Sequence, residues 1–410
     1  MAHLRNRGLG ATLGAAPILR RVAIVQGMRF APLVEPAPAL SPAERRRYAR
    51  HTRLVELGEV GQRRLAAARV LVVGAGGLGS PSLTYLAAAG VGTIGIVDDD
   101  VVEVSNLHRQ PLHGESDLDR PKVESAAQRL YEINPHVRVV THQERFSATS
   151  APELLDAYDL VVDGADNFAT RYLVTDACAL AGKPHVWASI NTFAGQLSVW
   201  WAGHGPCYRC VFPDPPPPGS VASCAEAGVL GVLPGVLGSL QAAEVIKLIT
   251  GIGDPAVGRI VLHDALAGTW DEVPVRARPD CALCGETPTI TAVEDPEAPP
   301  AVPQVEVAEL RDLLGSDEAA GQGLVVLDVR EESEFVEGRI LPSVHVPVQQ
   351  LLAGAADAEV GSWLAAGNEV VVYCRGGVRS DQAVAYLQRR GLDSARSLTG
   401  GIIAWSAQGD

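Results

Sequence analysis

Short apolar runs alternate with amphipathic segments along the first two thirds of the chain. The apolar runs predict β-strands at Arg69–Val73, Thr93–Asp98, Val137–His142 and Asp159–Asp163. The segments between them predict helices at Ser80–Ala89, Pro121–Tyr131 and Asn167–Ala181. Because strands and helices alternate, we expect a parallel sheet that is covered by helices on both faces. Residues 184–201 predict two more strands, and an apolar stretch at about 237–250 predicts a helix.

Changes in composition divide the chain into two α/β domains. Residues 1–40 are predicted to be a disordered tail, and ordered structure begins at Ser41, which can cap a helix that runs through about Glu56. The first domain spans residues 41–286. Repeated Pro, Glu and Ala predict a linker at 287–302, before a smaller domain at 303–410. The smaller domain has predicted strands and a helix at Leu324–Asp328, Val344–Val346, Glu369–Tyr373 and Val378–Arg390.

Composition and charge exclude several classes of function. The chain has 410 residues and a formal net charge of −14, which argues against nucleic acid or an anionic membrane as the main partner. We find no apolar run of roughly 18 residues, so no membrane span is predicted. The first 34 residues hold five arginines and no acidic residue, as targeting peptides do. We interpret them as part of the tail, with Met28 as an alternative start.

Seven cysteines fall into chemically different neighbourhoods. An odd number in a chain of this length disfavours a disulfide framework, which predicts a reducing, cytoplasmic location. Two Cys-x-x-Cys pairs, Cys207/Cys210 and Cys281/Cys284, have the spacing that lets both thiolates face one tetrahedral ion, although about seventy residues separate the pairs. The alternative is two unrelated turns with buried thiols. Cys178 lies in an apolar helical run and is predicted to pack in the core.

A glycine-rich turn follows the first predicted strand. Gly74-Ala-Gly76-Gly77-Leu-Gly79 fits the G-x-G-x-x-G pattern, whose glycines let backbone N–H groups approach a phosphate at a helix N-terminus. Asp98 ends the next predicted strand, where an acidic residue binds ribose hydroxyls. Both features are also typical of nicotinamide dehydrogenases, so they predict a nucleotide site without identifying the nucleotide.

Three further segments indicate which class of nucleotide-binding enzyme the first domain resembles. They are Asp98-Asp-Asp-Val-Val-Glu-Val-Ser105-Asn106-Leu-His-Arg109-Gln110, Pro121-Lys122-Val-Glu-Ser and Asp163-Gly-Ala-Asp166-Asn167. With the glycine turn, they closely resemble the MoeB/ThiF family, adenylating enzymes related to ubiquitin activators that activate the small carriers of molybdopterin and thiamine biosynthesis. The resemblance covers about residues 41–286 and implies a Rossmann-like adenylation domain that uses ATP and Mg²⁺.

The resemblance assigns roles to residues of these segments. Arg109 and Lys122 neutralise triphosphate charge as pyrophosphate leaves, and Asp166 holds Mg²⁺ at the carboxyl edge of the sheet. Asp166-Asn167 can also cap the next helix. Arg50 reaches the neighbouring subunit's site, which implies a homodimer. The complete implied ATP site consists of Gly76, Gly77, Asp98, Ser105, Asn106, Arg109, Lys122, Asp166, Asn167 and Arg50 of the partner subunit.

The same resemblance assigns the remaining cysteines. All four members of the Cys-x-x-Cys pairs match the family, which implies a structural zinc ion with no open coordination position. Cys224 lies in a Pro/Gly-rich loop where relatives carry a functional cysteine, which implies a thioester or disulfide partner. An ordinary surface or packed cysteine is the alternative for Cys224.

A cysteine loop marks the C-terminal domain. The relevant segments are Leu327-Asp328-Val329-Arg330-Glu331, Glu334-Phe-Val-Glu-Gly338-Arg-Ile340 and Cys374-Arg375-Gly376-Gly377-Val378-Arg379-Ser380. The glycines let N–H groups turn toward one sulfur at a helix N-terminus, and Arg375 and Arg379 add positive charge that favours a thiolate. These segments resemble the rhodanese family, small α/β sulfurtransferases that carry sulfur as a cysteine persulfide. The resemblance implies that Cys374 carries the persulfide and that residues 375–380 cradle it.

Together these features predict a two-step enzyme. ATP adenylates the C-terminal glycine of a small ubiquitin-like sulfur carrier that ends in Gly-Gly, and a persulfide then converts the acyl group to a thiocarboxylate. The predicted catalytic residues are Cys224, Cys374, Arg109, Lys122 and Asp166. A cysteine desulfurase or thiosulfate supplies the sulfur. The alternatives are thioester activation for protein conjugation, a dehydrogenase fused to a sulfurtransferase, and a non-catalytic carrier scaffold.

Overall fold

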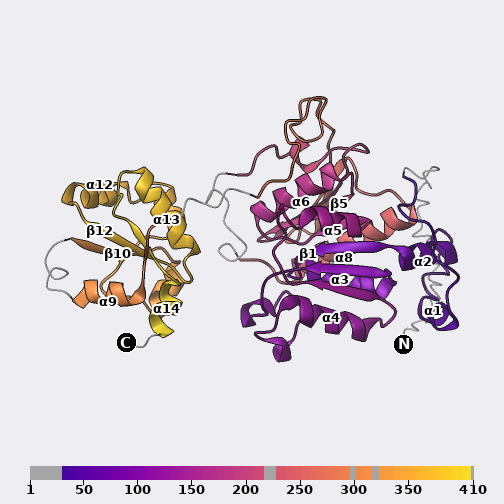
Figure 1. Cartoon of the computed structure of the whole chain (residues 1–410), viewed down its shortest axis with the longest axis horizontal. Coiled ribbons are helices and arrows are strands. Elements are labelled where there is room, and N and C mark those ends of the chain that lie inside the picture. Colours follow the sequence, from indigo (N-terminus) through magenta and orange to yellow (C-terminus); the bar gives the residue numbers. More distant parts are fainter. Residues whose placement is uncertain (1–29, 217–227, 296–301, 316–322, 408–410) are drawn as a thin grey trace, which may run out of the picture.

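Two β-sheets organise the computed structural model, which describes residues 30–216, 228–295, 302–315 and 323–407. The first sheet has eight strands in the order β3-β2-β1-β4-β5-β6-β7-β8, and the second has five in the order β11-β10-β12-β13-β9. In Figure 1 the first sheet belongs to the indigo-to-orange part of the chain and the second to the orange-to-yellow part. The α/β class predicted from the alternation of the sequence is therefore confirmed for both parts.

Helices cover both faces of the first sheet. Its strands are β1 (Arg69–Val73), β2 (Thr93–Val97), β3 (Arg138–His142), β4 (Leu160–Asp163), β5 (His185–Asn191), β6 (Ala194–Trp200), β7 (Arg259–Asp264) and β8 (Thr269–Pro274). Its α-helices are α1 (Pro42–Arg47), α2 (Gly58–Ala67), α3 (Gly79–Ala89), α4 (Lys122–Ile133), α5 (Ala151–Ala157), α6 (Phe168–Leu180) and α8 (Val232–Thr250). Side chains alternate along β1, so Val70 and Val72 pack with α3, α4 and α8, whereas Leu71 and Val73 pack with α5 and α6.

The register of the central strands brings three strand ends to one edge of the sheet. Val73, at the end of β1, pairs with Val97 of β2 on one side and with Asp163 of β4 on the other. Because the three strands are parallel, the loops that follow them meet at the same edge. Ligands of open α/β sheets bind at this kind of edge, outside the carboxyl ends of the strands.

The sheet is not parallel throughout, which corrects the expectation from the sequence. The strands from β3 to β5 are parallel, but β6, β7 and β8 are each antiparallel to the strand before them. A tight hairpin joins β5 to β6 at Thr192, whose φ of 50° is left-handed, and so short a connection cannot make a parallel crossover. Strand β8 is exposed along its whole length, so no buried face marks it in the sequence.

Helix α8 is the core helix of the first domain. By length and composition it is the one described helix that could cross a membrane, although no membrane span was predicted from the sequence. However, it packs against α2, α3, β5 and β6, and Leu237 and Val245 are fully buried. Its apolar composition is therefore explained by burial inside the domain.

The predicted N-terminal helix is shorter than expected. It ends at Arg47, and turns follow until α2 begins. Tyr48 is buried at this point, and its hydroxyl oxygen accepts a hydrogen bond from Asn134 Nδ2 at 2.8 Å. This tertiary contact lies outside the local capping pattern from which the longer helix was inferred.

Part of the predicted disordered tail lies against the first domain. Leu33 N donates a hydrogen bond to Leu248 O at 3.2 Å, and Leu40 is buried. Residues 30–40 therefore form part of the domain rather than a free tail. The remaining tail residues, 1–29 with Met28 among them, lie outside the described residues.

The second sheet is parallel in all its pairings. Its strands are β9 (Gln304–Val305), β10 (Leu324–Asp328), β11 (Val344–His345), β12 (Glu369–Tyr373) and β13 (Arg396–Leu398). Its helices are α9 (Val307–Gly315), α10 (Glu332–Glu337), α11 (Val348–Leu352), α12 (Asp357–Ala366), α13 (Val378–Arg389) and α14 (Gly401–Ala407). Val370 and Val372 of β12 pack in one core cluster and Val371 and Tyr373 in another, so both faces of this central strand are buried.

Candidate active sites

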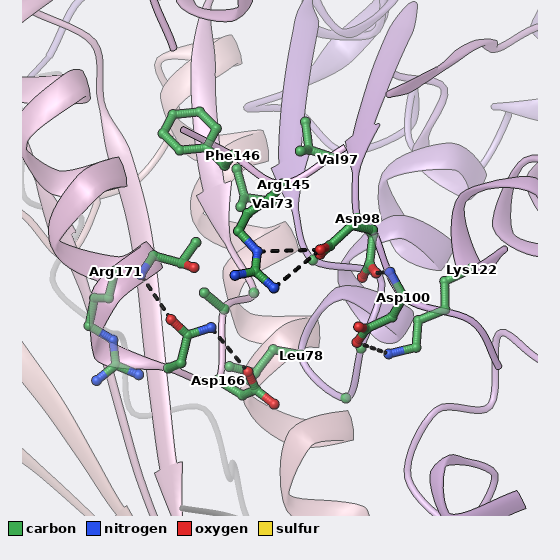
Figure 2. Close-up of a pocket in the computed structure, with 18 of the residues that line it drawn as sticks. Val73, Leu78, Val97, Asp98, Asp100, Lys122, Arg145, Phe146, Asp166 and Arg171 are labelled. Atoms are coloured by element: carbon green, nitrogen blue, oxygen red, sulfur yellow. Dashed lines mark hydrogen bonds and ion pairs between the residues drawn. The ribbon is translucent and has the colours of Figure 1, made fainter. Parts of the chain in front are cut away.

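A cavity of about 860 Å³ lies at the carboxyl edge of the first sheet, where β1, β2 and β4 end. This volume is typical of a site for a small molecule. Figure 2 shows charged side chains converging on it. Eight of the ten residues implied for ATP binding line the cavity: Gly76, Gly77, Asp98, Asn106, Arg109, Lys122, Asp166 and Asn167. Ser105 does not line it, and Ser105 Oγ instead donates to Glu103 Oε2 at 3.1 Å. Arg50 is predicted to act in the site of the partner subunit, and this stays a prediction.

The glycine turn between β1 and α3 is held by close backbone packing. A Cβ atom on Gly79 would lie 1.9 Å from Gly74 O, and Gly74 itself has a φ of +92°. Both positions therefore require glycine. The turn is also held by the peptide groups of Ala75, because Ala75 N donates to Asp98 Oδ2 at 2.7 Å and Ala75 O accepts from His113 Nε2 at 3.0 Å.

His113 is a buried histidine that the sequence analysis did not identify. Its Nε2 must carry the proton, because the Ala75 carbonyl can only accept, and its Nδ1 therefore accepts from Ser125 Oγ at 2.8 Å. Burial lowers the pKa of His113, which favours this neutral form. Burial likewise raises the pKa of Asp98, while Lys122 acts in the opposite direction. His113 and Asp98 together fix the orientation of the turn at Ala75.

Replacing His113 by leucine should raise the KM for ATP by roughly 5- to 10-fold, the effect of about one hydrogen bond. The His113→Gln variant should recover much of this loss, because its side-chain amide can donate to Ala75 O. Steady-state adenylation kinetics measure the effect, and sulfur transfer by the second domain serves as the internal control. An unchanged KM in the leucine variant would contradict the role given to His113.

Two predicted cations are held at the cavity by neighbouring oxygens. Lys122, which is buried, donates from Nζ to Asp100 Oδ2 at 2.8 Å. Arg109 donates from Nη1 to Ser105 O at 2.8 Å. Both side chains are therefore positioned before any phosphate binds, which lowers the cost of placing positive charge there.

Two further arginines line the cavity and were missed from the sequence. Arg171 is buried, with its guanidinium 4.9 Å from the centroid of the Phe168 ring. It lies four residues after Asn167, which caps α6, so the spacing of a helix could have predicted that Arg171 lies near the same cavity. Arg145 pairs with Asp99 at 3.3 Å between Nη2 and Oδ2. No local pattern marks Arg145, because tertiary folding brings the loop after β3 to the cavity.

The loop after β4 presents Asp166 to the cavity. The buried Asp163 shapes this loop, since its Oδ1 accepts from Ala165 N at 2.9 Å and its Oδ2 contacts His185 Nε2 at 3.1 Å. Asn167 caps α6 by accepting from Thr170 N at 2.9 Å and also lines the cavity. Asp166 is left exposed, so its carboxylate is available as a ligand.

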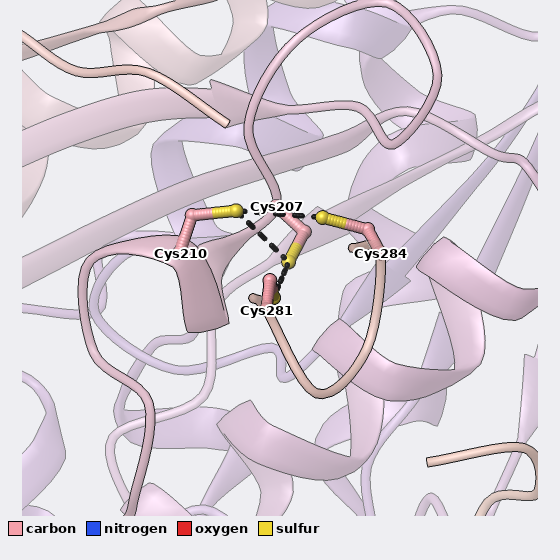
Figure 3. Close-up of side chains that lie close together, drawn as sticks. All are labelled: Cys207, Cys210, Cys281 and Cys284. Carbon is pink, nitrogen blue, oxygen red and sulfur yellow. Dashed lines mark hydrogen bonds between the residues drawn. The ribbon is translucent and has the colours of Figure 1, made fainter. Parts of the chain in front are cut away.

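The two Cys-x-x-Cys pairs come together in one group, here called the four-cysteine cluster, as Figure 3 shows. All four sulfurs lie within 4.8 Å of one another. The closest separations are 3.4 Å between Cys210 and Cys284, 3.6 Å between Cys207 and Cys281, and 3.8 Å between Cys207 and Cys210. Four thiolates around one tetrahedral zinc ion would be about 3.8 Å apart. A hydrogen bond from Cys207 lowers the pKa of Cys210 to about 5, whereas the same contact raises the pKa of Cys207 and burial raises that of Cys284.

In the second domain, Cys374 lies between the end of β12 and the N-terminus of α13. Its Sγ accepts a hydrogen bond from Gly377 N at 3.1 Å, and Ser380 Oγ lies 3.6 Å away. The carbonyls of Cys374 and Arg375 point to α14, where they accept from Ile402 N and Ile403 N at 2.9 and 3.2 Å. The loop is thus fixed on its outer side while the amide of Gly377 turns toward the sulfur.

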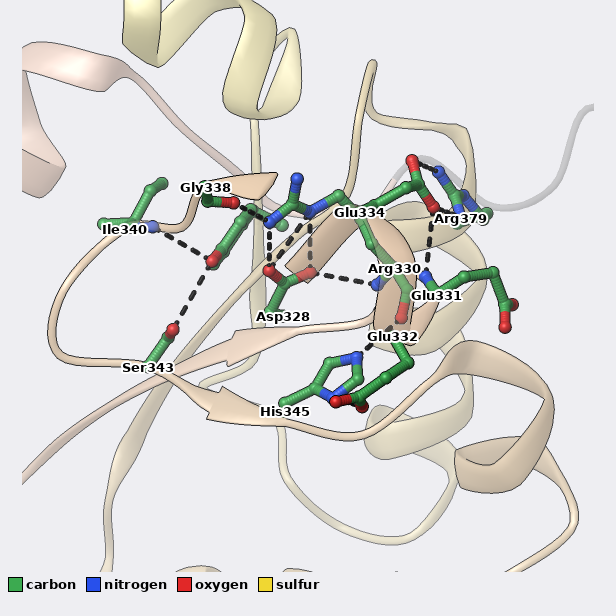
Figure 4. Close-up of polar contacts among 11 residues, drawn as sticks. Asp328, Arg330, Glu331, Glu332, Glu334, Gly338, Ile340, Ser343, His345 and Arg379 are labelled. Atoms are coloured by element: carbon green, nitrogen blue, oxygen red, sulfur yellow. Dashed lines mark hydrogen bonds and ion pairs between the residues drawn. The ribbon is translucent and has the colours of Figure 1, made fainter. Parts of the chain in front are cut away.

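Figure 4 shows an ion pair between Arg379 of the cysteine loop and Glu334, and a second ion pair in the segment that follows β10. Arg379 makes two contacts with the Glu334 carboxylate, at 2.7 and 2.8 Å, and these lower the pKa of Glu334. The buried Arg330 pairs with Asp328 and also donates to Gly338 O at 2.6 Å. Because Glu334 balances the charge of Arg379, the exposed Arg375 is the cradle cation that faces solvent.

Cys224 lies outside the described residues, so its environment stays a prediction. Cys178 is buried in the core cluster with α5 and α6, as predicted, and burial raises its pKa well above the usual value.

The fold and these two sites define a class of α/β protein that combines a phosphate-binding turn with a cysteine loop at a helix N-terminus. Comparison with known proteins supports the same division of the chain into two parts. Residues 48–283 match the ThiF family and residues 306–408 match the rhodanese-like domain. The chain belongs to the ThiF family, and it carries a rhodanese-like domain in its C-terminal part.

Relatives share both parts of the chain. It is 46% identical over 392 residues to a protein of Mycobacterium tuberculosis named probable adenylyltransferase/sulfurtransferase MoeZ, across 92% of this chain and 96% of the relative. It is 44% identical over 401 residues to adenylyltransferase and sulfurtransferase MOCS3 of Sus scrofa, across 92% of this chain and 88% of the relative. Among solved structures, Escherichia coli MccB with MccA-N7isoASN shares the fold, with a TM-score of 0.54, 23% identity and coverage of 59% of this chain and 75% of MccB.

Proposed function

We propose that the chain uses ATP to adenylate the C-terminal carboxylate of a small ubiquitin-like sulfur carrier and then replaces the AMP with sulfur from Cys374. The observation that carries this proposal is that one chain holds both a cavity built on a phosphate-binding turn and a sulfur-binding cysteine loop. Relatives of nearly full length are named for both activities. The carrier serves molybdopterin, thiamine or a related sulfur-incorporation pathway.

In the first step, a carboxylate oxygen of the carrier attacks the α-phosphorus of ATP. A P–O bond forms, and the bond to pyrophosphate breaks with the electron pair leaving on pyrophosphate. Lys122 and Arg109 stabilise the negative charge that develops, and the amides of the glycine turn bind the phosphates. Asp166 would hold Mg²⁺, since an exposed carboxylate at this edge is the hard oxygen ligand that Mg²⁺ prefers.

In the second step, the terminal sulfur of a persulfide on Cys374 attacks the acyl-adenylate carbonyl. A C–S bond forms and AMP leaves with the electron pair of the broken C–O bond. The product is an acyl disulfide on Cys374. A thiol must then attack the Cys374 sulfur, which releases the thiocarboxylate and leaves a disulfide. The attacking thiol is Cys224 or an external thiol. A dithiol then reduces the resulting disulfide and regenerates the enzyme.

The four-cysteine cluster is proposed to bind a structural zinc ion that ties the chain after β8 to η3 (Tyr208–Cys210) and to Cys207 before it. The enzyme is further proposed to act as a cytoplasmic homodimer in which Arg50 serves the neighbouring site. The sulfur donor is a cysteine desulfurase or thiosulfate.

Purified protein should contain about one zinc ion per chain, and Cys281→Ser should lose the ion and lower the Tm by at least about 5 °C. Elemental analysis and thermal unfolding measure these effects. Cys178→Ala is the matched control, because it removes a buried thiol outside the cluster and should retain zinc. Wild-type protein that is fully folded without zinc would contradict this assignment.

Carrier-dependent exchange between ATP and labelled pyrophosphate tests the proposed function. We expect exchange only with a carrier that ends in Gly-Gly, followed by an oxygen-to-sulfur mass change at its C-terminus when thiosulfate and a dithiol are present. Thermal stabilisation by NAD but not ATP would favour a dehydrogenase. A stable carrier thioester without the mass change would favour conjugation. No exchange with any ubiquitin-like carrier would contradict the proposal.

A further inference from the structure

The segment that leaves the four-cysteine cluster does not leave the first domain. Residues 286–295, here called the strap, continue along its surface although most of them were predicted to be linker. Thr289 N and Ile290 N both donate to Ala282 O, at 2.8 and 2.9 Å. Ile290 also packs against the buried cysteines of the cluster. The first half of the strap is therefore fixed to the cluster by backbone bonds and apolar contact.

The second half of the strap reaches the nucleotide cavity. Val293 packs against the core cluster that contains α5 and α6. Two residues later, Asp295 Oδ1 accepts a hydrogen bond from Ala148 N at 2.8 Å. Asp295 and the neighbouring Ser147 both line the cavity. The last described residue before the second domain thus lies at the mouth of the proposed ATP site.

This attachment shortens the tether between the two active sites. Only six residues, 296–301, separate Asp295 from Val302, which is buried in the core of the second domain. At about 3.6 Å per residue in a fully extended chain, the stretch from Asp295 to Val302 spans at most about 25 Å. A tether that began at Cys284 would span more than twice that distance. The strap therefore sets where the second domain is attached and how far it can travel.

We propose that the strap is a positioning element for sulfur transfer, which places the start of the tether at the cavity of its own chain. Cys374 then attacks the adenylate formed in the same chain. This inference rests on the two-step function proposed above. A short tether gives an effective concentration in the millimolar range, whereas separate chains meet at micromolar concentrations. Delivery within one chain should therefore dominate over delivery between chains.

Mixing two complementary variants tests delivery within one chain. One variant, Cys374→Ala, adenylates the carrier but cannot carry sulfur. The other, Lys122→Ala with Asp166→Ala, carries sulfur but cannot adenylate. At about 1 μM of each, a concentration well below the millimolar effective concentration of the tether, the mixture with thiosulfate and dithiothreitol should form carrier thiocarboxylate at less than about a fifth of the wild-type rate. A higher rate would overturn the proposal. Failure of the wild-type protein itself to form thiocarboxylate would instead refute the underlying function.

Releasing the strap tests its role directly. Val293→Asp places a carboxylate against the apolar core cluster, which should free residues 291–295 and lengthen the tether. Thiocarboxylate formation should fall roughly two- to threefold relative to the pyrophosphate exchange of the same variant, since effective concentration decreases with tether length. Exchange is measured alongside because Asp295 of the strap also lines the cavity. Thr291→Asp is the matched control, because it adds the same charge at an exposed position of the strap. Equal rates of thiocarboxylate formation in the two variants would overturn the role of the strap.

Discussion

Replacing Cys374 by serine should reduce thiocarboxylate formation at least about 1000-fold, as loss of a nucleophile does in other enzymes. The serine Oγ can still accept from Gly377 N, so the loop keeps the hydrogen bond that Sγ makes at 3.1 Å. A hydroxyl cannot carry a sulfane sulfur. The loss therefore reports the missing persulfide and not a collapsed loop. Mass spectrometry of the carrier after reaction measures the product.

The first half-reaction provides the control for Cys374. Pyrophosphate exchange should stay within about twofold of wild type, because Cys374 belongs to a core cluster formed by residues of the second domain alone. Cys178→Ala removes another buried thiol and should leave thiocarboxylate formation intact. Product formation at the wild-type rate by the Cys374 variant would show that the carrier receives sulfur by another route.

The second large effect is expected at Lys122. Replacing this buried lysine by methionine keeps most of its packing but removes an ammonium group from the cavity. Carrier-dependent exchange should fall by about 100- to 1000-fold, the range seen when one preorganised charge-stabilising donor is removed. The partner left behind, Asp100, is exposed, so it keeps its hydration and the fold should tolerate the change.

An exposed cation on the same helix separates this effect from a general change in charge. Arg129 of α4 pairs with Glu132 at the surface and does not line the cavity. Arg129→Ala should therefore leave exchange unchanged. Sulfur transfer from thiosulfate to cyanide should stay normal in both variants, since that reaction needs the second domain alone. Exchange by the methionine variant within about fivefold of wild type would contradict the role of Lys122, because a preorganised donor contributes far more than that.

The sequence located the glycine turn and the cysteine loop because their constraints are local. Gly79 illustrates this point, since any side chain there would collide with Gly74 O within the same turn. In the same way, Cys374 and Gly377 are three residues apart, so their hydrogen bond is encoded in one short segment. Family motifs of this kind carried the prediction of both sites.

The residues that the sequence did not reveal depend on long-range folding. Arg145 and Asp295 line one cavity although they are far apart in the chain. Asp295 arrives there because the strap runs from the four-cysteine cluster, and most of the strap was assigned to a linker because it precedes the repeated Pro, Glu and Ala of residues 296–302. His113 was missed for a related reason, because its partner Ala75 lies on the other side of β2 in the sequence. Contacts between residues far apart in the chain produce no regular spacing in the sequence from which they could be predicted.

Helix α8 has a consequence for the order in which the chain can fold. It begins at Val232, yet it covers the face of the sheet at β4, β5 and β6 and buries the side of α3. A nascent chain that has reached only β6 therefore already has its phosphate-binding turn but exposes that apolar face. The nucleotide site should mature late during synthesis, once α8 has left the ribosome. A shortened chain that ends before Val232 would keep every nucleotide motif and still lack a stable core.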